Sequence, residues 1–393
     1  MQRVAVADVD TAQMRRAGKD LLSLALMDAR NRSLRWAAAF EQAPTGATLL
    51  LYELGQLGWF QEHWIARNLQ RQRGARCDVS RPKLASILPG SDALFEVPGG
   101  ALPTDLQTVR QYLADTLETT LELLERGPED DDALYFYRLS LLREDACAEN
   151  FAVLAQALGV DTGLVVPAES RPGRPPLLFP ATRWMLGSVP GGFVPDQEHW
   201  AHEVALPEFE IDSQAVTWAQ FGEFVQDGGY DDRRHWPEAG WDWVQAEGRR
   251  TPRFVDQMRH GVLQQRFGRL VRSPLAHPAV HLSWFEADAW CRWAGRRLPG
   301  EAEWEAAASQ GATRGFRWGE VHEWTAGTLR PYPGAAGPSP GQSSDPVPGG
   351  PGALRVQRGA SFATPGRLRA AKARSGVAPG DDRRFCGFRS CAF

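Results

Sequence analysis

The segment from His277 to Ala308, HPAVHLSWFEADAWCRWAGRRLPGEAEWEAAA, carries the clearest local structural signals in the chain. Ser283 is followed three residues later by Glu286, a capping-box spacing that predicts the start of a helix. Apolar residues then recur on one helical face, and Gly295 tolerates the left-handed turn that ends many helices. A second helix is predicted from 301, with acidic residues in its first turn, where the helix dipole favours negative charge. The apolar run 279–282 is predicted to be strand-like.

The first 160 residues are predicted to be helical. Apolar residues recur at helical spacing over 18–40, about 48–69, 105–126 and about 132–158. Thr104 is predicted to cap the third of these helices, and Gly159 to end the fourth. Four helices of this length with one long connection predict an up-down four-helix bundle, in which side chains from facing helices can build an internal site.

A change in composition separates this region from the rest. Residues 161–180, DTGLVVPAESRPGRPPLLFP, are rich in Pro, Gly and small residues, which predicts a linker. Of the 15 tryptophans, 12 follow it, beginning with Trp184. We therefore expect domains at 1–160 and 181–393, the second an irregular α+β unit. Within it Thr217 and Gln220 predict another capping box, and the Pro- and Gly-rich run 331–352 predicts a long surface loop.

Charge and cysteine content limit the classes of partner. The formal net charge of −4 gives no electrostatic reason to expect nucleic acid or an anionic membrane as a partner. No apolar run approaches the ~20 residues that a membrane span needs, and the N-terminus lacks an apolar signal-peptide core. Five cysteines, sparse and odd in number, fit reduced thiols better than a disulfide framework. These features predict a cytoplasmic protein.

Several strings in the second half resemble the signature of the formylglycine-generating enzyme and sulfatase-modifying-factor superfamily. The resemblance implies that residues 181–393 form an irregular α+β domain of the sulfatase-modifying-factor, C-type-lectin-like kind. The strings that carry it, in chain order, are Trp284-Phe285-Glu286-Ala287, Leu298-Pro299, Glu301-Ala302-Glu303-Trp304-Glu305, GEVHEWT at 319–325, RGASF at 358–362 and Gly387-Phe388-Arg389.

A wider resemblance covers nearly the whole chain. The runs LSLALMDARNRSLRW at 22–36, SILPGSD at 86–92 and GGFVPDQEHWAHEV at 191–204 resemble the selenoneine synthases and, beyond them, the ergothioneine sulfoxide synthases. That resemblance implies a DinB-like four-helix bundle in front of the sulfatase-modifying-factor domain. It also implies the chemistry of that family, in which a non-haem iron and O2 join sulfur or selenium to the imidazole ring of hercynine.

The iron ligands that the resemblance implies are replaced here. The family holds its iron with one histidine on the second helix and two in a His-x-x-x-His-x-Glu run on the fourth. Gln56, Arg143 and Cys147 stand at these positions, and of the run only Glu149 is present. A guanidinium is a permanent cation with no lone pair to offer a metal. We therefore expect no metal site and no iron cofactor. His63, the one histidine before the linker, is expected to be a packed helix residue.

The substrate-binding positions implied by the resemblance have changed as well. Ser375, Gly376 and Val377 stand where the family has an asparagine followed by aromatic residues that contact hercynine. Together with Glu149 they are the candidate substrate-binding residues. His322 stands where the family has a tryptophan. No catalytic residue is assigned.

Other polar residues have simpler interpretations. His277 and His281 would share a face of a strand and are expected to have packing roles. In the formylglycine-generating enzymes, the resemblance implies, two copper-binding cysteines follow the RGxSF string. The corresponding run here, 367–374, has no cysteine, so sulfatase maturation is not expected. Cys386 and Cys391 are therefore expected to be small buried residues. Four basic residues of the run 367–374 could bind an anion, but the preferred interpretation is a solvated basic face; they are Arg367, Arg369, Lys372 and Arg374. No role is assigned to Tyr332.

The preferred hypothesis is a selenoneine or ergothioneine synthase-like protein that has lost its iron and its oxidative activity. Such a pseudoenzyme would bind a small molecule of the hercynine or thiol/selenosugar type, or a protein partner, between its domains. One alternative is an active synthase that uses non-standard ligands. A second is a pure interaction module, and a third is a decaying duplicate without a selected role. The sequence leaves the choice between sulfur and selenium, the ligand and the oligomeric state open.

Overall fold

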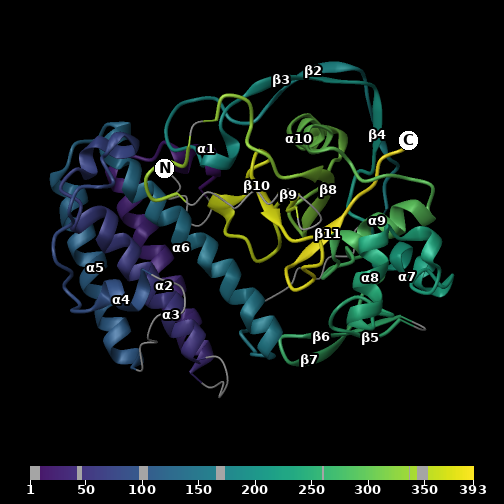
Figure 1. The fold of residues 1–393 in the computed structure, drawn as a ribbon, viewed down its shortest axis with the longest axis horizontal. Coiled ribbons are helices and arrows are strands. Elements are labelled where there is room, and N and C mark those ends of the chain that lie inside the picture. The colour runs from purple at the N-terminus through teal and green to yellow at the C-terminus, as the bar shows by residue number, and fades with distance from the viewer. Residues whose placement is uncertain are drawn as a thin grey trace.

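The computed structural model describes residues 9–41, 47–96, 105–164, 173–258, 261–335, 337–342 and 353–393. A helical region comes first in the chain, and a region of small sheets and short helices follows, as Figure 1 shows. The predicted fold class, a helical N-terminal region followed by an α+β region, is confirmed.

The predicted helices of the first region are present. α2 begins one residue after Gly18 and α6 ends before Gly159, whose φ of 67° is the left-handed conformation predicted for it. The predicted second helix is α3, which continues into one π-helical turn, Glu62–Ala66. The helices are α1 (Thr11–Arg15), α2 (Lys19–Phe40), α3 (Ala47–Gln61), α4 (Ser91–Phe95), α5 (Leu106–Arg126) and α6 (Asp131–Leu158).

The cap of α5 differs from the prediction. Asp105 is its N-cap, and the Asp105 carboxylate accepts hydrogen bonds from the backbone N–H groups of Gln107 and Thr108. The predicted cap, Thr104, lies outside the described residues. Asp and Thr are both good N-caps, so propensity does not choose between adjacent candidates.

Within its described residues, the second region holds four small sheets. In the largest, the strand order is β10-β9-β8-β11, and β11 runs parallel to β8 while the other neighbours are antiparallel. β1 lies inside the predicted linker 161–180 and pairs with β4. The strands are β1 (Leu177–Phe179), β2 (Thr182–Leu186), β3 (His202–Leu206), β4 (Phe209–Ile211), β5 (Val255–Gln257), β6 (Val262–Arg266), β7 (Arg269–Ser273), β8 (His322–Thr328), β9 (Arg355–Gly359), β10 (Arg374–Val377) and β11 (Cys386–Phe388).

Both predicted capping boxes are present in this region. The Ser283 hydroxyl accepts from the Glu286 N–H, and the Glu286 carboxylate accepts from the Ser283 N–H. In the other box, the Thr217 hydroxyl accepts from the Gln220 N–H, and the Gln220 carbonyl oxygen accepts from the Thr217 N–H. The strand-like interpretation of 279–282 is wrong: no strand is assigned there, and His281 has a φ of 64°. The helices are α7 (Trp218–Gln226), α8 (Glu238–Glu247), α9 (Trp284–Trp293) and α10 (Glu301–Gln310).

Helix α6 connects the two regions. It lies on the side of the bundle that faces the largest sheet (Figure 1). Phe136 belongs to the apolar core of the bundle, whereas Phe151 belongs to a core cluster that continues into the second region through residues such as Trp218 and Phe285. The Gln156 amide also donates to the backbone carbonyl of Gln265 at 2.8 Å. One helix thus contributes to both cores.

Among the helices of the described ranges, we find none whose length and hydropathy would let it cross a lipid bilayer.

Candidate functional site

A cavity of about 450 Å³ lies between the bundle and the largest sheet. One wall comes from α6, and the opposite wall from β8, β9, β10 and the segment after β9. Residues of α1, Phe60 and residues within the segments 193–198 and 341–342 complete the lining. Its volume is within the range of ~300–1,000 Å³ that is usual for small-molecule sites. The polar lining residues include Arg143, Asp145 and Glu149 on the α6 wall and His322, Gln357, Arg367 and Ser375 on the opposite wall.

Glu149 connects the two walls. Its carboxylate lies 2.7 Å from Nε2 of His322 and accepts hydrogen bonds from Oγ of Ser361 at 2.5 Å and Oγ1 of Thr364 at 2.8 Å. Burial acts to raise the pKa of Glu149, but the His322 ring and these hydrogen bonds outweigh it and lower the pKa to about 2. We call these four residues the Glu149 cluster. Both carboxylate oxygens are used in joining the two regions.

A second ion-pair set lies beside this cluster. Arg367 donates to both oxygens of Asp145, at 2.5 and 2.7 Å, and to Asp28 on α2 at 2.7 Å. Arg374 lies 3.1 Å from Glu301 and is also buried. The prediction that these arginines belong to a solvated basic face is therefore wrong. Their acidic partners lie far away in the sequence, which gave no local sign of the pairing.

The three positions that the resemblance assigns to iron are close together in the bundle but offer unsuitable ligands. Nη2 of Arg143 donates to Oε1 of Gln56 at 2.9 Å, so these two side chains bind each other. Burial raises the pKa of the Cys147 thiol to about 12, which keeps it protonated. Over the described ranges, no group of three or more His, Cys, Asp and Glu side chains is placed to hold a metal ion. These side chains do not fit an iron centre.

The structure brings together only some of the candidate site residues. Arg143, Glu149 and Ser375 line the cavity, whereas Gln56, Cys147, Gly376 and Val377 do not appear in its lining. Gly376 packs against Leu329: a Cβ there would meet the Leu329 side chain at 2.4 Å. His322, Gln357, Asp145 and Arg367 were not predicted as site residues. The four-residue spacing of Asp145 and Glu149 on one face of α6 was the available signal.

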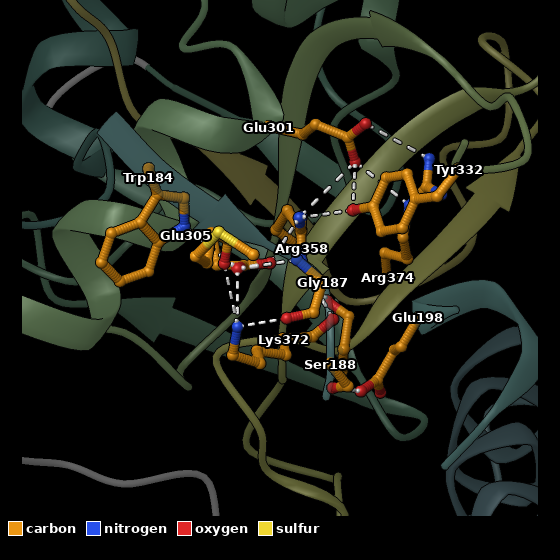
Figure 2. Close-up of polar contacts among 12 residues, drawn as sticks. Trp184, Gly187, Ser188, Glu198, Glu301, Glu305, Tyr332, Arg358, Lys372 and Arg374 are labelled. Atoms are coloured by element: carbon orange, nitrogen blue, oxygen red, sulfur yellow. Dashed lines mark hydrogen bonds and ion pairs between the residues drawn. The ribbon is translucent and has the colours of Figure 1, made fainter. Parts of the chain in front are cut away.

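Tyr332 belongs to a buried polar network that also includes Arg374, the first residue of β10 (Figure 2). Its hydroxyl donates to Glu301 at 3.3 Å and accepts from Arg358 at 3.1 Å, and burial raises its pKa. Arg358 also donates to Glu305 at 2.9 Å, and Lys372 lies 3.2 Å from the same carboxylate. Arg374, which lines the cavity, pairs with Glu301. The network therefore positions one wall of the cavity.

The remaining polar candidates have packing roles. The ring of His63 lies 4.7 Å from that of Trp59 and 5.1 Å from that of Trp64, and burial lowers the pKa of His63 to about 4. His281 is buried, and its ring lies 4.8 Å from that of Phe254. Cys386 and Cys391 are buried free thiols, as predicted.

Residues 180–320 match the family described as Sulfatase-modifying factor enzyme 1-like domain. The second region thus defines a protein built on a sulfatase-modifying-factor domain. Over most of its length the chain is similar to proteins named hercynine oxygenase. That of Mycolicibacterium smegmatis is 31% identical over 376 residues, which cover 81% of this chain and 85% of the relative.

Two further relatives carry the same name. The protein of Mycolicibacterium thermoresistibile is 29% identical over 408 residues, covering 87% of this chain and 88% of the relative. That of Mycobacterium tuberculosis is 28% identical over 373 residues, covering 80% and 84%. The chain belongs to the hercynine oxygenase family.

Proposed function

We propose that this chain is an iron-independent member of its family that binds a small molecule in the cavity between α6 and the largest sheet, without oxygenase activity. The ligand is of the hercynine or thiol/selenosugar type. The observation that carries the proposal is the 2.9 Å hydrogen bond between Arg143 and Gln56, at two of the three positions that the resemblance assigns to iron ligands.

Coordination chemistry supports the loss of iron. A facial triad needs three lone-pair donors that leave other positions open for O2 and substrate. Arg143 has no lone pair to give, and its positive charge would repel a ferrous ion. Gln56 already accepts a hydrogen bond from it through the carbonyl oxygen that would have to bind the metal.

The family likeness supports the class of ligand. The relatives are named for an oxygenase reaction on hercynine, and the similarity extends over both regions that form the cavity. The walls remain joined by the Glu149 cluster and by the pair of Arg367 with Asp145, so a small molecule could contact both regions at once. The five free cysteines, all of them buried, support the cytoplasm as the compartment.

Metal analysis of the purified protein tests the proposal. We expect substoichiometric iron after expression in iron-supplemented medium, no O2 consumption with hercynine and a thiol or selenosugar, and calorimetric binding of hercynine to the iron-free protein. Near-stoichiometric iron with turnover would refute it. The rival hypothesis, an active synthase with non-standard ligands, predicts that Gln56→Ala and Cys147→Ala each abolish iron uptake. A pure interaction module predicts no hercynine binding while a protein partner co-purifies.

A further inference from the structure

The charged side chains on the cavity wall are almost all paired within the protein. His322 pairs with Glu149, and each of the following arginines lies beside a carboxylate: Arg15 with Glu198, Arg138 with Asp131, Arg367 with Asp145, Arg374 with Glu301 and Arg384 with Asp381. Arg143 differs. In the described parts of the chain, no carboxylate lies within 4.0 Å of its guanidinium, so it is the cavity-lining arginine without a counter-ion.

The contacts of Arg143 leave part of its guanidinium unused. Nη2 donates to Gln56, and the guanidinium carbon lies 4.5 Å from the centre of the Phe60 ring. Nε is buried and has no hydrogen-bond partner among the described residues. Glu53 on α3 is within electrostatic reach of Arg143, but burial raises the pKa of Glu53 and the two do not form an ion pair. The guanidinium is thus fixed in place, with donors still available.

The opposite wall holds an unpaired group as well. Gln357 on β9 lines the cavity and is 1% exposed. Its Nε2 donates to Sγ of Cys386 at 2.8 Å. Its carbonyl oxygen, Oε1, has no partner among the described residues. Buried polar groups are rarely left without a partner, because each costs free energy. The Nε atoms of Arg15 and Arg374 on the cavity wall also have no partner among the described residues, but both arginines already pair with a carboxylate. The unpaired atoms of Arg143 and Gln357 on facing walls are therefore the two that indicate a ligand.

The chemistry of the two groups defines the ligand class. A guanidinium presents a planar fork of donors that matches a carboxylate or phosphate with two parallel hydrogen bonds. We infer that Arg143 is the docking point for an anionic group, carboxylate or phosphate, of a small ligand whose N–H or O–H donor reaches Gln357. This inference rests on the proposed function, since it names the chemistry of the molecule bound in the same cavity. Arg143, at a position that the resemblance assigns to an iron ligand, would then determine which ligand the cavity binds.

Inorganic phosphate is the probe that tests this inference, because it carries the anionic chemistry without the rest of the ligand. Its affinity for the full-length protein is measured by calorimetry in chloride buffer of constant ionic strength and pH. Removing charge-assisted hydrogen bonds in Arg143→Gln is expected to weaken phosphate binding on the order of 10- to 100-fold. Arg143→Lys, which keeps the charge but not the fork, is expected to lie between that variant and the wild type.

The matched control is Arg384→Gln, which changes a cavity-lining arginine that already has Asp381 as a partner. Its phosphate affinity is expected to equal that of the wild type. Thermal unfolding in chloride shows whether each variant is folded. No phosphate binding by the wild type, or equal affinity in the wild type, Arg143→Gln and Arg143→Lys, would overturn the inference.

The two proposals fail separately. Iron-free protein that binds hercynine with the same affinity in the wild type and in Arg143→Gln would refute the role of Arg143 and leave the proposed function standing. Iron-loaded protein that turns over hercynine, yet loses its phosphate affinity in Arg143→Gln, would refute the proposed function and support the anion site.

Discussion

Replacing Glu149 by Gln tests how the two regions are held together. In the folded protein the pKa of Glu149 is lowered from its ordinary value of 4.5 to about 2, which at 1.36 kcal/mol per unit corresponds to about 3 kcal/mol. A group with a depressed pKa contributes stability above its unfolded pKa and loses that contribution as the pH falls through its folded pKa. We therefore expect Glu149→Gln to cost about 3 kcal/mol at pH 7. The cost should shrink between pH 4.5 and pH 2.

Urea unfolding measures this difference. The free energies of unfolding of the wild type and of Glu149→Gln are compared at pH 7, 5, 4 and 3, with tryptophan fluorescence as the signal. Glu203→Gln is the control, because Glu203 also pairs with an arginine but its side chain is 55% exposed. That variant should match the wild type at every pH. A loss in Glu149→Gln that does not change with pH, or one below about 1 kcal/mol at pH 7, would refute the assigned role.

Three further predictions concern buried ionisable groups. Arg358→Met should destabilise the protein by about 3–5 kcal/mol by leaving Glu305 without its guanidinium partner. The double variant Arg358→Met/Glu305→Met should lose less than the sum of the single losses in urea unfolding, and strict additivity would contradict this account. Burial raises the pKa of Glu286 to about 7. The wild type should therefore lose stability relative to Glu286→Gln as the pH rises from 4.5 to 7, and equal pH profiles would disprove that origin. Arg367→Met, which removes both hydrogen bonds to Asp145, should speed amide hydrogen exchange in 361–374 more than in α9. Equal acceleration of exchange in the two segments would contradict the role of Arg367 in holding 361–374.

Local signals were sufficient for most of the helices. The capping box of Ser283 and Glu286 and the helix end at Gly159 depend on residues within a few positions of each other, and both are present as predicted. Strand β1 was missed because Leu177–Phe179 lies among prolines and is defined by its pairing with β4, thirty or more residues away. The apolar run 279–282 resembles a strand in composition, but His281 adopts a conformation that breaks it.

The site was only partly predictable because many of its contacts join residues far apart in the sequence. Helical spacing and the family resemblance identified the right part of α6, including Arg143 and Glu149. They could not show that Arg367 finds its partners Asp145 and Asp28 at separations of 222 and 339 residues. No recognisable sequence pattern marks Gln357 as a site residue. It lines the cavity only because the fold brings β9 and α6 to the same cavity.

Helix α6 also limits how this gene can be divided. Because Phe136 and Phe151 belong to different apolar clusters on the same continuous helix, a break near residue 160 would expose a hydrophobic face on each fragment. Separate expression of the two halves should therefore yield aggregation-prone products, and co-expression should rescue them only if they reassemble. Recombination that exchanges one half for that of a distant relative would face the same barrier unless α6 and its neighbours on both sides are exchanged together.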